Sequence, residues 1–133
     1  MKPIEVLIVD DNAADVLLIR IALAGEPYPM NLHVAVDGQQ ALELLIGDNL
    51  HPDLLILDLD TPRMTGMIFL ELYRSTFPIV VFTSSTNLDD ERRALELGAR
   101  EFVRKPFHFE PFADEVSRIF RKWASPGGSA EQR

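Results

Sequence analysis

Charged residues stand directly after three apolar segments that have the length and composition of buried β-strands. They are Asp10 and Asp11 after residues 4–9, Asp58 after residues 54–57, and Lys105 after residues 99–104. Parallel strands of an open sheet bring their carboxyl ends to one edge, so we expect these carboxylates and the ammonium to meet there. Several carboxylates around one ammonium repel one another and are costly to desolvate, whereas a divalent cation would offset both effects. The pattern therefore predicts a metal-binding site at this edge.

The elements that must position these side chains alternate along the chain. The expected strands are residues 4–9, 32–36, 54–57, 79–82 and 99–104. The expected helices are residues 13–24, 39–46, 67–75, 88–97 and 109–123, with Asn12 and Asn87 as caps of the first and fourth. We therefore predict one α/β domain over residues 1–124, a three-layer (βα)5 fold with a doubly wound parallel sheet, and a flexible tail at 125–133.

Composition narrows the class of function. The chain has 133 residues, enough for one domain, and a formal net charge of -8. This charge argues against binding to nucleic acid or to anionic membranes. Cysteine is absent, which excludes disulfides and thiolate zinc sites. We recognise neither a signal peptide nor an apolar segment of the ~20 residues that spans a bilayer, so we expect a cytoplasmic protein.

Four segments of the chain resemble one known family. They are VDDNAADVLLIRIAL, VDGQQAL, DLDTPRMTG, which begins at Asp58, and FTSS, which contains Thr83. The chain resembles CheY-like receiver domains of two-component response regulators over residues 4 to about 122. Within that family it looks most like stand-alone regulators that partner phytochrome-type histidine kinases. The resemblance implies a flavodoxin-like sheet with strand order 2-1-3-4-5.

The same resemblance implies a phosphoacceptor and a metal site. Asp58 would accept a phosphoryl group from a phosphohistidine of a partner histidine kinase. Asp11, Asp58 and the backbone carbonyl of Asp60 would bind Mg²⁺ directly, and Asp10 would take part through water. The protein would then be a phosphoprotein of a phosphorelay rather than an enzyme that turns over an external substrate.

Further roles follow for residues near the ends of the fourth and fifth strands. Thr83 would hydrogen-bond the phosphoryl group and act in switching, Lys105 would pair with the phosphoryl group, and Phe102 would be the aromatic switch residue. The bond between Lys105 and Pro106 would be a candidate cis peptide. Taken singly, these residues also suit a strand end, a solvated loop or core packing, and it is their joint occurrence that favours the site.

Two other functions are compatible with parts of the sequence. The stretch from Asp58 to Thr61 matches the DxDxT motif of haloacid-dehalogenase-type phosphohydrolases, in which Asp60 would be the acid or base. Against this, the acidic pair precedes the nucleophile, and the remaining ~75 residues are few for that family's later motifs and cap. The other alternative is a receiver-like scaffold that takes no phosphate.

The chain is also expected to pair with a second copy of itself. Mixed charges occur along the fourth helix, the fifth strand and the fifth helix, which should share one outward face. They are Asp90, Arg93, Arg100, Glu101, Arg104, Asp114, Arg118 and Arg121. A two-fold axis would let opposite charges meet, so we predict a homodimer through this face, favoured by phosphorylation.

Overall fold

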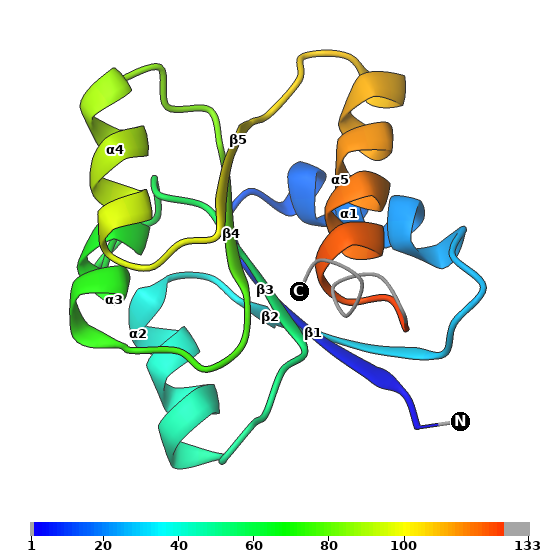
Figure 1. Ribbon diagram of the computed structural model, residues 1–133, viewed down its shortest axis with the longest axis horizontal. Helices are drawn as coiled ribbons and strands as arrows, with labels where there is room; N and C mark the ends of the chain where they lie inside the picture. The colour runs from blue at the N-terminus through cyan, green and yellow to red at the C-terminus, as the bar shows by residue number, and fades with distance from the viewer. Residues whose placement is uncertain (1, 127–133) are drawn as a thin grey trace.

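Five parallel strands form the centre of the molecule, whose computed structural model describes residues 2–126. The strands are β1 (Ile4–Val9), β2 (Met30–Ala35), β3 (Leu54–Leu57), β4 (Ile79–Thr83) and β5 (Glu101–Arg104). Their order in the sheet is β2-β1-β3-β4-β5, and every neighbouring pair is parallel (Figure 1). The predicted strand order is therefore confirmed.

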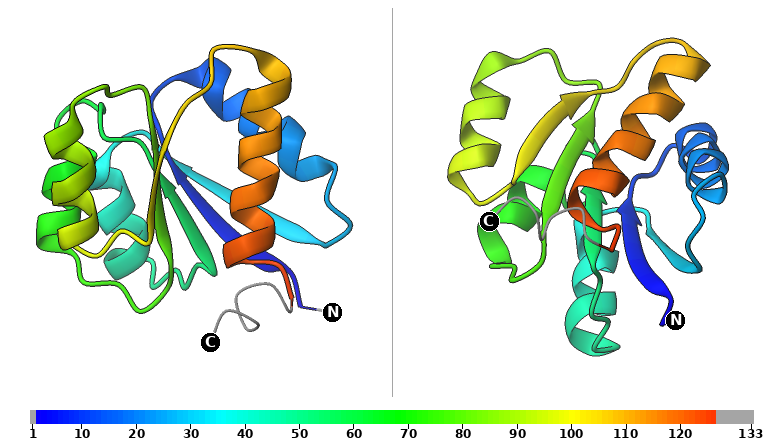
Figure 2. Two further views of the ribbon diagram at one scale, coloured as in Figure 1. Left: turned by 45° about the horizontal axis from the view of Figure 1, so that its top comes forward. Right: turned by 45° about the vertical axis from the view of Figure 1, so that its right-hand side comes forward.

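Helices cover both faces of the sheet, which gives the predicted three layers. On one face lie α1 (Ala13–Ala24) and α5 (Phe109–Trp123). On the other lie α2 (Gly38–Leu42), the π-helical turn η1 (Glu43–Gly47), α3 (Gly66–Leu72) and α4 (Leu88–Glu96) (Figures 1 and 2). Each layer closes over its own cluster of buried apolar side chains. No helix within residues 2–126 combines the length and the apolar character needed to cross a membrane.

Several predicted boundaries differ from the structure. The second strand starts at Met30 rather than at residue 32, because it pairs with β1 from Ile4 onward. The helix predicted at 39–46 is a short α-helix that widens into the η1 turn, where the N–H of Asp48 bonds to the carbonyl of Glu43. The third helix ends at Leu72, three residues early. Residues 127–133 of the predicted flexible tail lie outside the described residues.

The predicted helix caps are confirmed for α1 and α4. The side chain of Asn12 accepts a hydrogen bond from the N–H of Asp15, and Asn87 accepts one from the N–H of Asp89. His108 precedes α5 without a side-chain cap. This helix is held instead by a buried stripe of Phe112, Val116, Ile119 and Phe120. The apolar face of α5 thus compensates for its missing cap.

An ion pair between the buried Asp37 and the exposed Arg63 connects the segment after Asp58 to the start of α2. Asp37 is 0% exposed and accepts hydrogen bonds from the N–H of Gln40 at 2.9 Å and from Nε of Arg63 at 2.6 Å. Arg63 adopts a left-handed backbone with φ 58°. The N–H of Gly38 also donates to the carbonyl of Met64 at 2.9 Å. The loop that follows the predicted phosphoacceptor is therefore fixed to a second element, an arrangement that our sequence reasoning did not find.

We predict a pH-dependent contribution of Asp37 to stability. Burial opposes its ionisation, but hydrogen bonds from Arg63 and from the backbone lower the pKa of Asp37 below its ordinary value. A carboxyl with a lowered pKa stabilises the fold above the unfolded-state pKa of ~4, and this contribution is lost as pH falls through the folded-state value. Asp37→Asn should therefore destabilise the protein by about 1 kcal/mol at pH 7, and by progressively less below about pH 4.

Urea unfolding of both proteins between pH 3 and pH 7 measures this difference. Asp48→Asn is the matched control, because it removes the same charge from an exposed position. A gap between wild type and Asp37→Asn that stays constant over the whole pH range would contradict the prediction.

Candidate functional site

The carboxyl ends of β1, β3, β4 and β5 carry the residues predicted for the site. Asp10 follows β1, Asp58 follows β3, Thr83 is the last residue of β4, and Lys105 follows β5. Asp10, Asp11 and Asp58 each offer a carboxylate oxygen, and these oxygens lie within 4.8 Å of one another. The expected meeting of charged residues at one edge of the sheet is therefore present.

Lys105 lies at the centre of this cluster. Its side chain is only 6% exposed, and its Nζ donates to Asp10 at 2.8 Å, to Asp15 at 2.8 Å and to Asp58 at 3.3 Å. Burial alone would lower the pKa of Lys105, but the hydrogen bonds with Asp10 and Asp15 raise it above its ordinary value. The lysine therefore carries its charge at any physiological pH, and it ties three carboxylates together.

Asp15 is the member of this cluster that sequence reasoning missed. It lies in the first turn of α1, where an acidic residue usually faces the helix dipole and solvent. In the structure its carboxylate turns to Lys105, which is 90 positions away in the chain. One signal in the sequence could have found it. Asp15 stands three residues after the Asn12 cap, on the helix that follows Asp10 and Asp11 at this edge of the sheet.

The four aspartates of the predicted metal site differ in exposure. Asp10 and Asp58 are buried, whereas Asp11 and Asp60 are exposed. Burial raises the pKa of Asp10 above its ordinary value, and the hydrogen bond from Lys105 opposes this. Partial desolvation of its carboxylate and the nearby charge of Asp58 raise the pKa of Asp60, although this residue is exposed overall. Unfavourable ionisation of this kind marks a site that gains from bound positive charge.

The cluster fits a hard divalent cation. Oxygens of Asp10 and Asp58 accept one hydrogen bond each from Lys105 and from the backbone, and every carboxylate oxygen has a second lone pair. Asp11 is exposed and adds a third carboxylate. Mg²⁺ and Mn²⁺ prefer such oxygen ligands and retain water on their open sides. One lysine neutralises only part of this negative charge, so the donor set suits a metal ion.

The loop after Asp58 passes so close to α3 that residue 66 must be glycine. A Cβ built on Gly66 would lie 2.4 Å from the backbone carbonyl oxygen of Asp58 and 2.9 Å from Cα of Leu59. The N–H of Gly66 also bonds to the carbonyl of Leu59 at 3.2 Å. The start of α3 thereby fixes the backbone that carries Asp58.

Thr83 and Phe102 belong to β4 and β5, the two strands next to each other at this side of the sheet. Thr83 is 0% exposed, and its hydroxyl oxygen accepts a long hydrogen bond of 3.4 Å from the N–H of Ser85. Phe102 is half-buried, and the guanidinium of Arg104 lies 5.6 Å from the centre of its ring. The switching roles predicted for both residues stay predictions.

The prediction of a cis bond between Lys105 and Pro106 is wrong for this structure, in which that bond is trans. The trans isomer of a bond before proline is the favoured one by about 0.5–1 kcal/mol. The N–H of Lys105 continues the pairing of β5 by donating to the carbonyl of Thr83 at 2.8 Å. Because its side chain reaches Asp10, Asp15 and Asp58 from this position, the trans bond already directs the lysine to the site.

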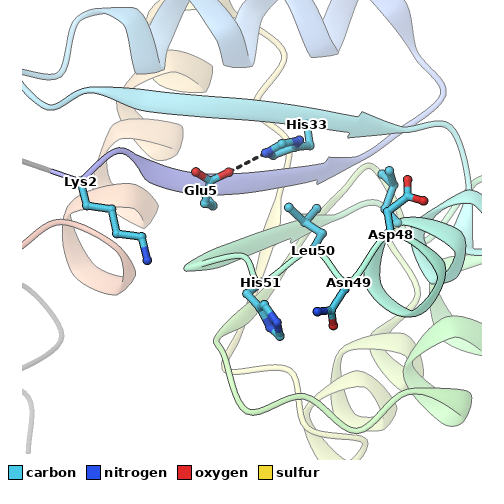
Figure 3. A pocket seen from close by; sticks show the side chains of 8 residues that line it. Lys2, Glu5, His33, Asp48, Asn49, Leu50 and His51 are labelled. Atoms are coloured by element: carbon cyan, nitrogen blue, oxygen red, sulfur yellow. Dashed lines mark hydrogen bonds and ion pairs between the residues drawn. The ribbon is translucent and has the colours of Figure 1, made fainter.

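A separate pocket lies toward the amino ends of β1 and β2. It is lined by Lys2, Glu5, His33, Leu44, Asp48, Asn49, Leu50 and His51 (Figure 3). Glu5 and His33 form a 2.7 Å hydrogen bond there, which lowers the pKa of Glu5. The predicted site residues lie elsewhere, and we assign the histidines no role in the chemistry.

Comparison with known proteins decides the family. The response regulator receiver domain family matches residues 6–117. This chain belongs to that family. The protein-glutamate methylesterase/protein-glutamine glutaminase 1 of Myxococcus xanthus is 36% identical over 118 residues, which are 87% of this chain and 34% of that protein. Response regulator MprA of Mycolicibacterium vanbaalenii is 31% identical over 132 residues, 97% of this chain and 55% of that protein. The receiver domain thus spans about a third to about half of these relatives.

Solved structures of receiver domains agree with this fold. The phosphorylated cyanobacterial phytochrome response regulator RcpA has a TM-score of 0.85 at 28% identity, covering 92% of this chain and 94% of that one. The Mn(2+)-bound response regulator Rcp1 has a TM-score of 0.83 at 27% identity, covering 91% and 94%. The response regulator domain of Thermotoga maritima CheB reaches 0.78 at 26% identity, covering 92% and 96%. The predicted likeness to CheY-like receivers, including phytochrome-associated ones, is confirmed, and the family match favours a receiver over a phosphohydrolase.

We predict that Gly66→Ala disturbs the receiver site as well as its stability. The added methyl group would meet backbone atoms, which cannot turn aside as a flexible side chain can. Overpacking of this kind costs about 1–3 kcal/mol, and here relief requires Asp58 or α3 to shift. The variant should therefore unfold at lower urea concentration and bind Mn²⁺ more weakly than wild type.

Gly47→Ala is the control, because a Cβ at Gly47 meets nothing within 4 Å. Its stability should match or slightly exceed that of wild type. Urea unfolding and Mn²⁺ titration measure the two effects, and wild-type behaviour of Gly66→Ala in both would contradict the prediction.

Proposed function

We propose that this receiver domain accepts a phosphoryl group on Asp58 from a phosphohistidine of a partner histidine kinase, in a reaction that requires Mg²⁺. One observation carries the proposal. The Asp58 carboxylate contacts the Lys105 ammonium and belongs to a cluster of three carboxylates suited to a cation. This is the charge arrangement that an incoming anionic phosphoryl group needs beside its acceptor.

Phosphoryl transfer requires no general base to activate the acceptor. A carboxylate is ionised at neutral pH, so an oxygen of Asp58 attacks phosphorus without losing a proton. The bond from phosphorus to the donor imidazole nitrogen breaks, its electron pair stays on that nitrogen, and a new bond joins phosphorus to the Asp58 oxygen. The protein contributes alignment and opposite charge.

The residues around Asp58 divide this task. Lys105 pairs with a phosphoryl oxygen, and the hydroxyl of Thr83 donates a hydrogen bond to another. Asp11, Asp58 and the backbone carbonyl of Asp60 would hold Mg²⁺, with Asp10 acting through water. The cation, when bound, neutralises phosphoryl oxygens as negative charge accumulates on them.

The partner in this proposal is a phytochrome-type kinase of the cytoplasm. Similarity to RcpA and Rcp1 over more than nine-tenths of the chain supports this choice. The signal would pass on through protein contacts, with Thr83 and Phe102 responding to the phosphoryl group. The methylesterase activity in the names of several longer relatives belongs to proteins of which this domain covers only about a third.

We predict that Asp58→Asn abolishes phosphorylation. With Mg²⁺ and acetyl phosphate or a phosphorylated kinase domain, wild type should gain one acid-labile phosphoryl group. The Asn variant should gain none, since its amide is a poor nucleophile, and it should keep the wild-type circular dichroism. Phosphate content by intact-protein mass spectrometry measures this.

Two results would decide against the proposal. Phosphorylation of Asp58→Asn to the wild-type level would contradict the choice of acceptor. Steady hydrolysis of p-nitrophenyl phosphate, lost in Asp60→Asn, would favour the phosphohydrolase alternative.

The proposed homodimer uses the face formed by α4, β5 and α5. Four of the charges predicted to meet across its axis are paired within the chain: Arg93 with Glu71, Arg118 with Glu101, and Arg121 with Glu26. Arg100 and Asp114 form no ion pair among the described residues. The interface we propose therefore depends less on crossed ion pairs than the sequence indicated.

We predict that phosphorylation raises the share of dimer. Light scattering of wild type, with and without acetyl phosphate and Mg²⁺, measures this, and Asp58→Asn serves as the control that should not respond. A protein that stays monomeric in both states at about millimolar concentration would contradict the dimer.

A further inference from the structure

Lys105 already uses its whole hydrogen-bonding capacity before any phosphoryl group arrives. An ammonium has three N–H donors, and the three go to Asp10, Asp15 and Asp58. The contacts with Asp10 and Asp15 are both 2.8 Å, whereas that with Asp58 is 3.3 Å. The acceptor is thus the carboxylate that the lysine holds least closely.

Asp15 differs from the other two carboxylates in having no part in the proposed chemistry. It is absent from the group of carboxylates whose oxygens converge for a metal ion, and it is not the phosphoacceptor. It belongs to α1, whose start is fixed by the Asn12 cap that accepts from the N–H of Asp15 itself. The helix therefore places on the lysine a carboxylate that does not come from the ends of the strands.

We propose that Asp15 is a positioning residue that competes with the phosphoryl group for Lys105 and so restrains phosphorylation of Asp58. The inference rests on the proposed function. The N–H that lies 3.3 Å from Asp58 can pass to a phosphoryl oxygen on that residue, and a second N–H of Lys105 becomes available only when Asp10 or Asp15 gives one up. Asp15 is the one that water can solvate most easily, since its side chain is 22% exposed against 3% for Asp10 and 7% for Asp58.

The release of Asp15 also links the site to α1. When Lys105 turns to the phosphoryl group, the carboxylate of Asp15 loses its hydrogen bond with the ammonium and is hydrated instead. The first turn of α1 then carries a negative charge that is no longer paired with the lysine. Asp15→Asn removes the charged competitor while keeping a side chain of the same shape, so the lysine becomes free to move toward Asp58.

A general charge effect must be separated from competition for the lysine. Removing any nearby negative charge lessens repulsion of an anionic donor, whether or not Lys105 is present. A double-mutant cycle distinguishes the two, because an effect that acts through Lys105 vanishes when the lysine is replaced. Lys105→Gln keeps a long polar side chain for this purpose.

The experiment compares initial phosphorylation rates with acetyl phosphate and Mg²⁺ in wild type, Asp15→Asn, Lys105→Gln and the double variant. Asp15→Asn should be about two- to fivefold faster than wild type, in keeping with the worth of a part-exposed ion pair. In the Lys105→Gln background the same change should have a clearly smaller effect, because only the general charge effect remains there. Asp15→Glu, whose longer side chain still reaches the ammonium, should stay close to wild type, and Asp48→Asn controls for net charge.

A second measurement does not depend on phosphorylation. Exchange of the Lys105 ammonium protons with water, followed by nitrogen-15 NMR, should be faster in Asp15→Asn than in wild type because one of three carboxylates no longer holds them. This readout also applies if a variant is phosphorylated too slowly to measure.

The outcomes separate this inference from the proposed function. If wild type takes no phosphoryl group from acetyl phosphate or a kinase, the proposed function fails. If proton exchange of the Lys105 ammonium is also the same in Asp15→Asn as in wild type, Asp15 does not hold the lysine and the inference fails as well. If wild type is phosphorylated but Asp15→Asn is no faster, or is equally accelerated with and without Lys105, the inference is wrong while the function stands.

Discussion

One buried ammonium holds together three carboxylates that would otherwise repel one another. Lys105 comes from the end of β5, and its partners come from the ends of β1 and β3 and from the start of α1. These contacts join segments 47 to 95 positions apart in the chain. Such a cluster is a poor source of stability, because the desolvation of each charge offsets much of the attraction. Its existence at the edge of the sheet is better explained by the reaction that we propose.

The parallel sheet explains why the position of this cluster could be predicted from the sequence. β1, β3 and β4 are mostly apolar, and each of the four functional strands ends at or just before a polar or charged residue, so the chain marks both the strand and its functional end. Parallel pairing then brings the ends together whatever the details of the helices. For this reason the strand order and the meeting of Asp10, Asp58 and Lys105 followed from the sequence and the family resemblance.

Features that depend on how elements cross were not predictable in the same way. Asp15 reaches Lys105 only because of the position of α1 over the sheet, and Arg63 meets Asp37 across 26 positions with a left-handed backbone that its residue type does not suggest. The η1 turn needs a wider hydrogen-bond pattern than the apolar spacing reveals. The cis bond was taken from the family rather than from these residues. The charges of the α4, β5 and α5 face were assigned to a partner because their internal partners, such as Glu26 and Glu71, lie on other elements.

The loop from Asp58 to Gly66 is held by contacts along its length. Backbone contact closes it at Gly66, the hydroxyl of Thr61 donates to the carbonyl of Met64 at 2.9 Å, and Arg63 binds Asp37. The segment after Thr83 is held by other elements, because the hydroxyl of Ser85 donates to Asp90 of α4 at 2.7 Å and the carbonyl of Ser85 accepts from Arg104 of β5 at 3.0 Å. The two sides of the site are therefore anchored to different parts of the domain. A change at Asp58 that alters the segment after Thr83 is passed directly to α4.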